Sequence, residues 1–176
     1  MIEAHRAALR HTHRLLLIVV PQNPARAPIL AEKMDKGEGW IIAQRSADEE
    51  PEAETEAYFA DASEYGLWYR LAPISYLGGS LSGGGCLRDP LEAAALGSSI
   101  IHGPRTGIFG PIFGRLGAAR ATRSVASTQD LTDALADLLA PDRAARYAQA
   151  AWAVASDGVE VTDRVQSLLR KMMGED

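Results

Sequence analysis

A glycine-rich segment between two short apolar runs constrains the fold of this chain more than any other feature. Five glycines fall within residues 78–85, and the runs Ile74–Leu77 and Ser99–His102 lie on either side. Runs this short, bounded by glycine and proline, are typical of buried strands, and Pro90–Leu96 between them is expected to be a short helix. A strand, a helix and a strand in this order predict a parallel sheet with a helical crossover.

The glycine-rich loop is also a candidate anion site. A loop that leads into a helix N-terminus exposes backbone N–H groups and the positive end of the helix dipole, and α/β proteins bind phosphate there. Two common nucleotide motifs do not fit. Arg88 breaks the dinucleotide fingerprint at its third glycine, and Gly85 stands where a Walker A loop needs lysine. We therefore expect neither NAD nor a P-loop nucleotide.

The start of the helix after the loop has two interpretations. Asp89 suits the N-cap, Pro90 the first helical position and Glu92 the third position of a capping box. Alternatively, the Glu92 carboxylate accepts hydrogen bonds from the 2′ and 3′ hydroxyls of a ribose. The two interpretations are compatible, because a carboxylate that caps with one oxygen leaves the other free.

The composition is that of one soluble globular domain. The 176 residues are 47% hydrophobic and 23% charged, and a chain of this length buries roughly two-thirds of its surface. The net charge of −5 argues against a general nucleic-acid binder. The one cysteine, Cys86, cannot form an internal disulfide, and a reactive thiol is the functional alternative for it. No apolar run approaches the ~20 residues of a membrane span.

The rest of the chain continues the alternation of strands and helices. Further strands are expected at Leu15–Val20, Trp40–Ala43, Tyr58–Ala60 and Ala119–Val125. Helices are expected at Glu3–Arg14, at Pro28–Lys36, from Ser63-Glu64 with Leu67, Trp68 and Leu71 toward the core, and weakly at Gly107–Leu116. Three closing helices are expected: one capped by Ser127, one from Pro141 with Tyr147 and Trp152 on its apolar side, and one with the stripe Val161, Val165, Leu168, Leu169 and Met172.

No metal site is predicted. His11 and His13 are two residues apart, which places them on different faces of a helix. The acidic run 48–56 lacks the spaced glycine turn of a calcium loop, so it is interpreted as a solvated loop.

Several ordered strings resemble the C-terminal domain of the 3-deoxy-D-manno-octulosonic acid (Kdo) transferases. The strings LGGSL, DPLEAAALG and IHGPRTGIF are similar to that family's GGS loop, N-P-L-E and G-P-x-T segments, and PQNPAR and DASEYGLWYRLAP resemble its P-R-H-P-E-R and D-T-x-G-E-L…YRLA segments. The resemblance covers nearly the whole chain. It implies an α/β fold with a Rossmann-like three-layer parallel sheet, helices on both faces and closing C-terminal helices, as in the C-terminal half of a GT-B glycosyltransferase.

The resemblance also implies a function. The family transfers Kdo from CMP-Kdo to a lipid A precursor at the cytoplasmic face of the bacterial inner membrane, without a cofactor. Residues 1–176 are then a single nucleotide-sugar-binding domain, and the N-terminal acceptor domain with the proposed glutamate base lies outside this sequence, so the domain alone is expected to be inactive. The implied donor site consists of Pro21, Gln22, Ser63, Glu64, Gly79, Ser80, Arg88, Asp89, Pro90, Leu91 and Glu92.

Three positions depart from the family pattern. Gln22 replaces an arginine and removes a cation expected near the phosphate, for which Arg26 or Arg88 could substitute. Asp89 replaces an asparagine, and a carboxylate repels phosphate where an amide donates to it. The Ser63-Glu64 match is one residue shorter and lacks a glycine, so the alternative there is a Ser63 cap with Glu64 in the first helical turn.

Two other classes of function remain open from the sequence. One is a GT-B domain for another nucleotide sugar such as a UDP-sugar, which competition between CMP and UMP would discriminate. The other is a non-enzymatic α/β interaction module whose glycine loop is only a tight structural turn.

Overall fold

The computed structural model describes residues 1–10, 12 and 14–173, with side chains through residue 157 apart from that of Glu38. His11 and His13 lie outside the described residues. The side chains of the predicted apolar stripe from Val161 to Met172 likewise lie outside the described part.

The described strands are all parallel, as the crossover pattern predicts. They are β1 (Leu17–Val19), β2 (Ile42–Gln44), β3 (Ala57–Phe59), β4 (Ile74–Tyr76), β5 (Ser99–His102) and β6 (Thr122–Ser124). They form one sheet in the order β1-β3-β2 and a second in the order β4-β5-β6. Each pairing is parallel, with Ile18 opposite Tyr58 in the first sheet and Ser75 opposite Ile100 in the second.

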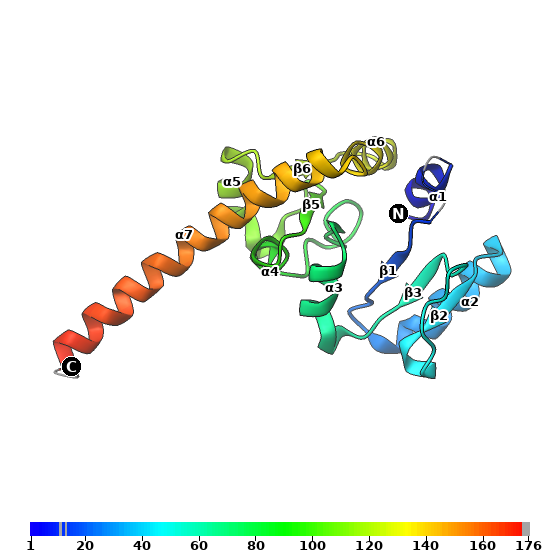
Figure 1. The fold of residues 1–176 in the computed structure, drawn as a ribbon, viewed down its shortest axis with the longest axis horizontal. Helices are drawn as coiled ribbons and strands as arrows, with labels where there is room; N and C mark the ends of the chain where they lie inside the picture. Colours follow the sequence, from blue (N-terminus) through cyan, green and yellow to red (C-terminus); the bar gives the residue numbers. More distant parts are fainter. Residues whose placement is uncertain (11, 13, 174–176) are drawn as a thin grey trace.

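Helices connect and cover these strands (Figure 1). The α-helices are α1 (Ile2–Leu9), α2 (Ala27–Glu38), α3 (Tyr65–Leu71), α4 (Pro90–Ala95), α5 (Gly110–Ala118), α6 (Thr128–Leu138) and α7 (Pro141–Met173). The 3-10 turns are η1 (Pro24–Arg26), η2 (Arg45–Ala47), η3 (Ala62–Glu64) and η4 (Gly107–Phe109). Two helices close the chain instead of the three predicted, because α7 continues without a break from Pro141 to Met173.

Strand β5 is buried on both faces, as expected for an internal parallel strand. Ile100 packs with Ala93 of α4 and Ala151 of α7 on one face. Ile101 packs with Leu131 and Leu138 of α6 on the other. Helix, sheet and helix thus form the predicted three layers, and each fully buried isoleucine contributes roughly 2–3 kcal/mol of apolar burial.

The strands divide into two sheets rather than forming one. Within the first sheet the N–H of Leu17 in β1 donates to the O of Glu56, the residue before β3, at 2.9 Å. Within the second, the N–H of Leu77, the residue after β4, donates to Ile101 O of β5 at 3.0 Å. Among the described strands, no backbone pairing joins β1 or β2 to β4, β5 or β6.

Helix α1 connects the two sheets instead. Its residues Ala4 and Ala8 pack in the α6 cluster of the second sheet. Ile2 packs against the core of the first sheet, and the His5 ring lies 5.3 Å from the ring of Trp40. A short helix therefore spans the space between two sheets that share no strand.

Two predicted apolar faces are wrong in part, although Trp68 of α3 and Tyr147 of α7 pack against core clusters as expected. In α3, Leu67 and Leu71 are exposed and Tyr69 is buried, because the helix packs through the i, i+4 pair Tyr65 and Tyr69. In α7, Trp152 is 54% exposed, whereas Ala151 is buried against α4. Small residues occupy the buried face of α7 because they let α7 and α4 approach closely, which a tryptophan would prevent.

Candidate functional site

The glycine-rich loop is packed backbone to backbone against the segment that follows β5. The N–H of Arg105 donates to Ser80 O at 2.8 Å, and the N–H of Cys86 donates to Arg105 O at 2.9 Å. The guanidinium of Arg105 adds a bond to Gly83 O at 2.6 Å. The loop is therefore held in one conformation by its neighbour.

The glycines are required by this packing. Gly79 has φ +80°, and a Cβ added to it would collide with Gly85 O. A Cβ on Gly103 would collide with the backbone of Ser80 and Leu81. Glycine is needed at these positions because the backbones of two chain segments touch directly, whether or not a ligand binds to the loop.

Ser80 is fully buried and serves this loop internally. Its hydroxyl donates to Leu77 O at 2.5 Å and accepts from the N–H of Gly103 at 2.8 Å. Pro90 is also fully buried. These two predicted site residues therefore shape the loop and the start of α4, and their side chains are turned away from solvent.

The start of α4 agrees only in part with the predicted capping box. The Asp89 carboxylate accepts from the N–H of Leu91 at 2.9 Å, so Asp89 is the N-cap. Glu92 does not return a bond to the cap. Its carboxylate pairs instead with the guanidinium of Arg88, and the side chains of both residues are about 40% exposed. The guanidinium carries a full positive charge whereas the backbone N–H of the cap carries only a partial one, so the carboxylate pairs with Arg88.

Arg88 is held by aromatic side chains as well. Its guanidinium lies over the Tyr65 ring, 4.1 Å from the centroid. Tyr65 and Tyr69 stack with their centroids 5.8 Å apart. Burial raises the pKa of Tyr69 to about 12, although its hydrogen bond with Arg88 opposes the rise. Tyr69 is therefore a neutral donor or acceptor beside the cation.

Tyr65 is the residue of this site that sequence reasoning missed. Its hydroxyl donates to Val20 O at 3.4 Å, next to the predicted pair Pro21-Gln22. It follows Glu64 directly in sequence and lies under Arg88. The tyrosines four residues apart, one turn of helix, were the signal that could have found it.

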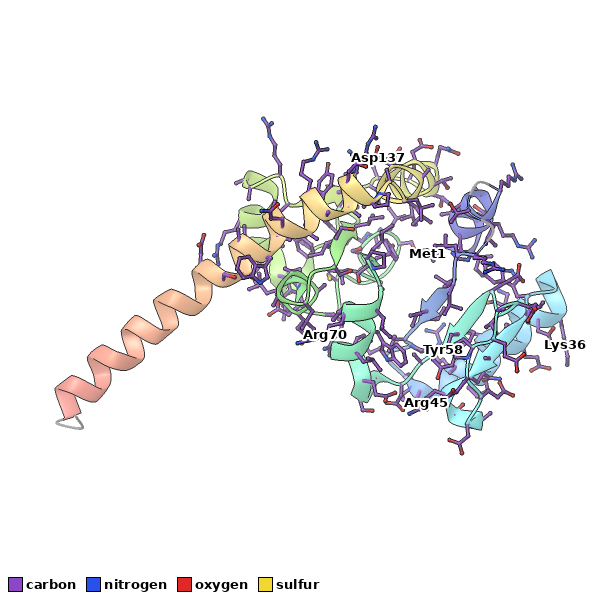
Figure 2. The ribbon with its side chains drawn as sticks, viewed as in Figure 1. Met1, Lys36, Arg45, Tyr58, Arg70 and Asp137 are labelled. Atoms are coloured by element: carbon purple, nitrogen blue, oxygen red, sulfur yellow. The ribbon has the colours of Figure 1, made fainter. Side chains whose placement is uncertain are left out.

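The Ser63-Glu64 segment lies at the carboxyl end of β3. Asp61, not Ser63, caps the 3-10 turn η3 that precedes α3: its carboxylate accepts from the N–H of Ser63 at 2.7 Å, and this bond lowers the pKa of Asp61. Glu64 pairs with Arg45, which follows β2, through Arg45 Nε and Glu64 Oε2 at 3.4 Å. Figure 2 labels Arg45, which begins η2 directly after β2, and Tyr58 of β3.

The predicted site segments thus lie at carboxyl ends of parallel strands. Pro21-Gln22 follows β1, Ser63-Glu64 follows β3, and Arg88 to Glu92 follow the loop after β4. Tyr65 links all three. The carboxyl ends of the strands are where open α/β sheets bind ligands. Arg26, the other candidate replacement for the missing cation, is exposed at the end of η1.

The reactive-thiol alternative for Cys86 loses support. Cys86 is buried, burial raises the pKa of its thiol, and Sγ donates to Arg88 O at 3.2 Å, so it lacks thiolate character. No group of three His, Cys, Asp or Glu side chains within the described residues is arranged to hold a metal ion. None of the described helices has the length and apolar character needed to cross a membrane.

A surface pocket of about 620 Å³ lies at the opposite edge of the first sheet. Leu15, Ile41 and residues 51–56 line it together with Arg14. None of the predicted site residues contributes to it. Because it lies at the amino ends of the strands, it is separate from the carboxyl-edge site.

Comparison with known proteins agrees with this architecture. No protein-family model matches the chain. The 3-deoxy-D-manno-octulosonic acid transferase of Haemophilus influenzae is 31% identical over 147 residues, which are 83% of this chain and 34% of that protein. That of Rickettsia felis is 26% identical over 161 residues, 89% of this chain and 34% of that protein. The chain therefore spans about a third of the length of the curated relatives it matches.

A solved structure gives the same result. The crystal structure of the C-terminal CMP-Kdo binding domain of WaaA from Acinetobacter baumannii superposes with a TM-score of 0.77 at 30% identity, covering 87% of this chain and 80% of that one. The fold is thus a Rossmann-like α/β domain of the type found as the C-terminal half of GT-B glycosyltransferases. The chain belongs to the family of 3-deoxy-D-manno-octulosonic acid transferases.

Proposed function

We propose that this chain is the donor-binding domain of a Kdo transferase and binds CMP-Kdo at the carboxyl edge of its strands. The convergence of three family-matching segments on Tyr65 is the observation that carries the proposal. In this assignment residues 1–176 act as one nucleotide-sugar-binding domain. The donor contacts come from the predicted segments around Gln22, Glu64 and Arg88 to Glu92.

The charges of the site suit an anionic ligand if the ion pair between Arg88 and Glu92 opens when the ligand binds. Gln22 carries no charge, so Arg88 supplies the cation for the donor's phosphate. When the phosphate replaces Glu92 as the partner of the guanidinium, the Glu92 carboxylate becomes free to accept bonds from the ribose hydroxyls. Asp89 uses one carboxylate oxygen on Leu91 N–H, which limits but does not remove its repulsion of the phosphate.

The chemistry assigned to this domain is leaving-group stabilisation. As the bond between the anomeric carbon and the phosphate oxygen breaks, positive charge develops on the sugar and negative charge on CMP. Arg88 and nearby backbone N–H groups stabilise that negative charge. The base that accepts the proton of the lipid A precursor's hydroxyl belongs, in this proposal, to another domain of the parent enzyme at the cytoplasmic face of the inner membrane. We accordingly expect the 176-residue chain to bind donor without transferring Kdo.

The proposal is tested by titrating the chain with CMP and, separately, with UMP while recording NMR chemical shifts. We expect saturable shifts for CMP at Gly79 to Glu92, reaching Gln22 and Glu64, and weaker or no shifts for UMP. A Glu92→Ala variant should keep the NMR spectrum of a folded domain. Its CMP affinity should fall about tenfold, the effect of one charge-assisted hydrogen bond. Equal binding of UMP would favour a UDP-sugar domain.

One observation favours the non-enzymatic alternative. The glycines at positions 79, 83 and 103 are already explained by contacts within the loop and do not require a ligand. An interaction module would need such a tight turn and no nucleotide. Absence of shifts with either nucleotide at millimolar concentration would support that alternative and contradict donor binding.

A further inference from the structure

Tyr65 makes contacts with three separate parts of the candidate donor site. Its hydroxyl donates to Val20 O at the end of β1, and its ring stacks on Tyr69 of the same helix. Arg88, from the loop before α4, lies 4.1 Å over the ring centroid. One side chain thus connects the two halves of the molecule where the site segments meet.

The stacking leaves Arg88 with hydrogen-bonding capacity. A guanidinium held over an aromatic ring keeps its N–H donors, because they point outward in its own plane. The guanidinium of Arg88 bonds Glu92 and shares a hydrogen bond with Tyr69. Its Nε is buried and has no hydrogen-bond partner among the described residues. A buried donor without a partner is costly, so an incoming acceptor would relieve it.

We propose that Tyr65 is a positioning residue that holds Arg88 in place for the anionic part of the donor. The inference rests on the proposed function, since the anion is the phosphate or the carboxylate of a nucleotide-linked sugar acid. The ring fixes the guanidinium without consuming its donors, whereas a carboxylate partner alone would occupy them.

The test is calorimetric titration of the 176-residue chain with CMP and with cytidine, which lacks the phosphate. We expect Tyr65→Leu to weaken CMP binding about fivefold, the scale of one cation–π contact, and to leave cytidine binding unchanged. Tyr65→Phe keeps the ring and should stay within about twofold of the original CMP affinity. Tyr147→Leu, at a half-buried tyrosine packed against the α6 cluster, is the matched control and should change neither affinity.

A second variant keeps the test decisive if Tyr65→Leu does not fold. Arg88→Lys keeps the charge but loses the planar fork, so CMP affinity should fall while cytidine affinity stays, and Tyr65→Met, which removes the ring but keeps an apolar side chain, should lower CMP affinity in the unmodified chain and add little in that background. Equal losses for CMP and cytidine, or unchanged CMP affinity in both variants, would overturn the positioning role. Binding of neither ligand by the unmodified chain would instead overturn the donor-binding proposal, and this inference with it.

Discussion

At the scale of single residues, each glycine has its own physical reason. Gly79 needs a positive φ, and Gly103 needs space for a neighbouring backbone. Gly117, in α5, has no neighbour within 4 Å of an added Cβ. The same residue type is therefore essential at one position and replaceable at another, and only the surroundings distinguish the two.

Gly103→Ala is expected to lower the free energy of unfolding by roughly 2–3 kcal/mol, because the new Cβ meets backbone that cannot move aside. Urea denaturation followed by circular dichroism measures the change. Gly117→Ala is the control and should raise stability by about 0.5–1 kcal/mol, since alanine favours a helix interior. Equal effects of the two substitutions would show that the loop contact at Gly103 is not as described.

At the scale of elements, short helices here are set by their partners more than by their own pattern. α3 buries Tyr69 and exposes Leu71, the reverse of what its leucines predicted. α4 begins at the predicted residue, with Asp89 as the cap, yet Glu92 turns to Arg88. A helix of two turns has too little surface for periodicity to decide which face is buried.

Asp89→Asn separates the structural and electrostatic roles of the residue that begins α4. Asparagine caps helices about as well as aspartate, so the free energy of unfolding should change by less than about 0.5 kcal/mol. The substitution removes a negative charge near the donor's phosphate, and CMP affinity should rise about two- to fivefold as like-charge repulsion ends. Calorimetric titration of both proteins with CMP measures the change in affinity. A fall in affinity would mean that the carboxylate itself contacts the donor.

At the scale of the whole molecule, the strands form two three-stranded sheets, whereas the sequence predicted one. α1 and the bond from Tyr65 to Val20 join them. In a parallel ladder alternate residues direct their N–H groups to opposite sides. The N–H group of Ile18 therefore points away from β3, toward the unpaired edge of β1. The N–H group of Tyr76 likewise points away from β5, toward the unpaired edge of β4.

Amide hydrogen exchange tests this arrangement. Leu17 and Leu77 donate within the sheets and should exchange at least about 100-fold more slowly than Ile18 and Tyr76. NMR-detected exchange resolves the four amides. Slow exchange at Ile18 and Tyr76 would show that another strand, for instance from a second copy of the chain, pairs with these edges. The mass of the particle in solution would then distinguish a monomer from a dimer.

Features that depend on interactions between residues close in sequence were predictable, and features that depend on contacts between distant segments were not. The positions of the strands, the start of α4 at Asp89 and the Ser127 cap of α6, which accepts from Asp130 N–H at 3.0 Å, were predictable from the sequence. These features depend on neighbouring residues and on breakers such as glycine and proline. The matched motifs also identified the family.

Tertiary structure alone decided the rest. It showed that Tyr65 contacts Val20 and Arg88, that Arg88 pairs with Glu92, that Trp152 is exposed and that the strands divide into two sheets. Each of these outcomes depends on segments that are distant in sequence and meet only after folding. Local patterns carry no information about which of several possible partners a charge, a ring or a strand edge will contact, because that choice is made by packing of the whole chain.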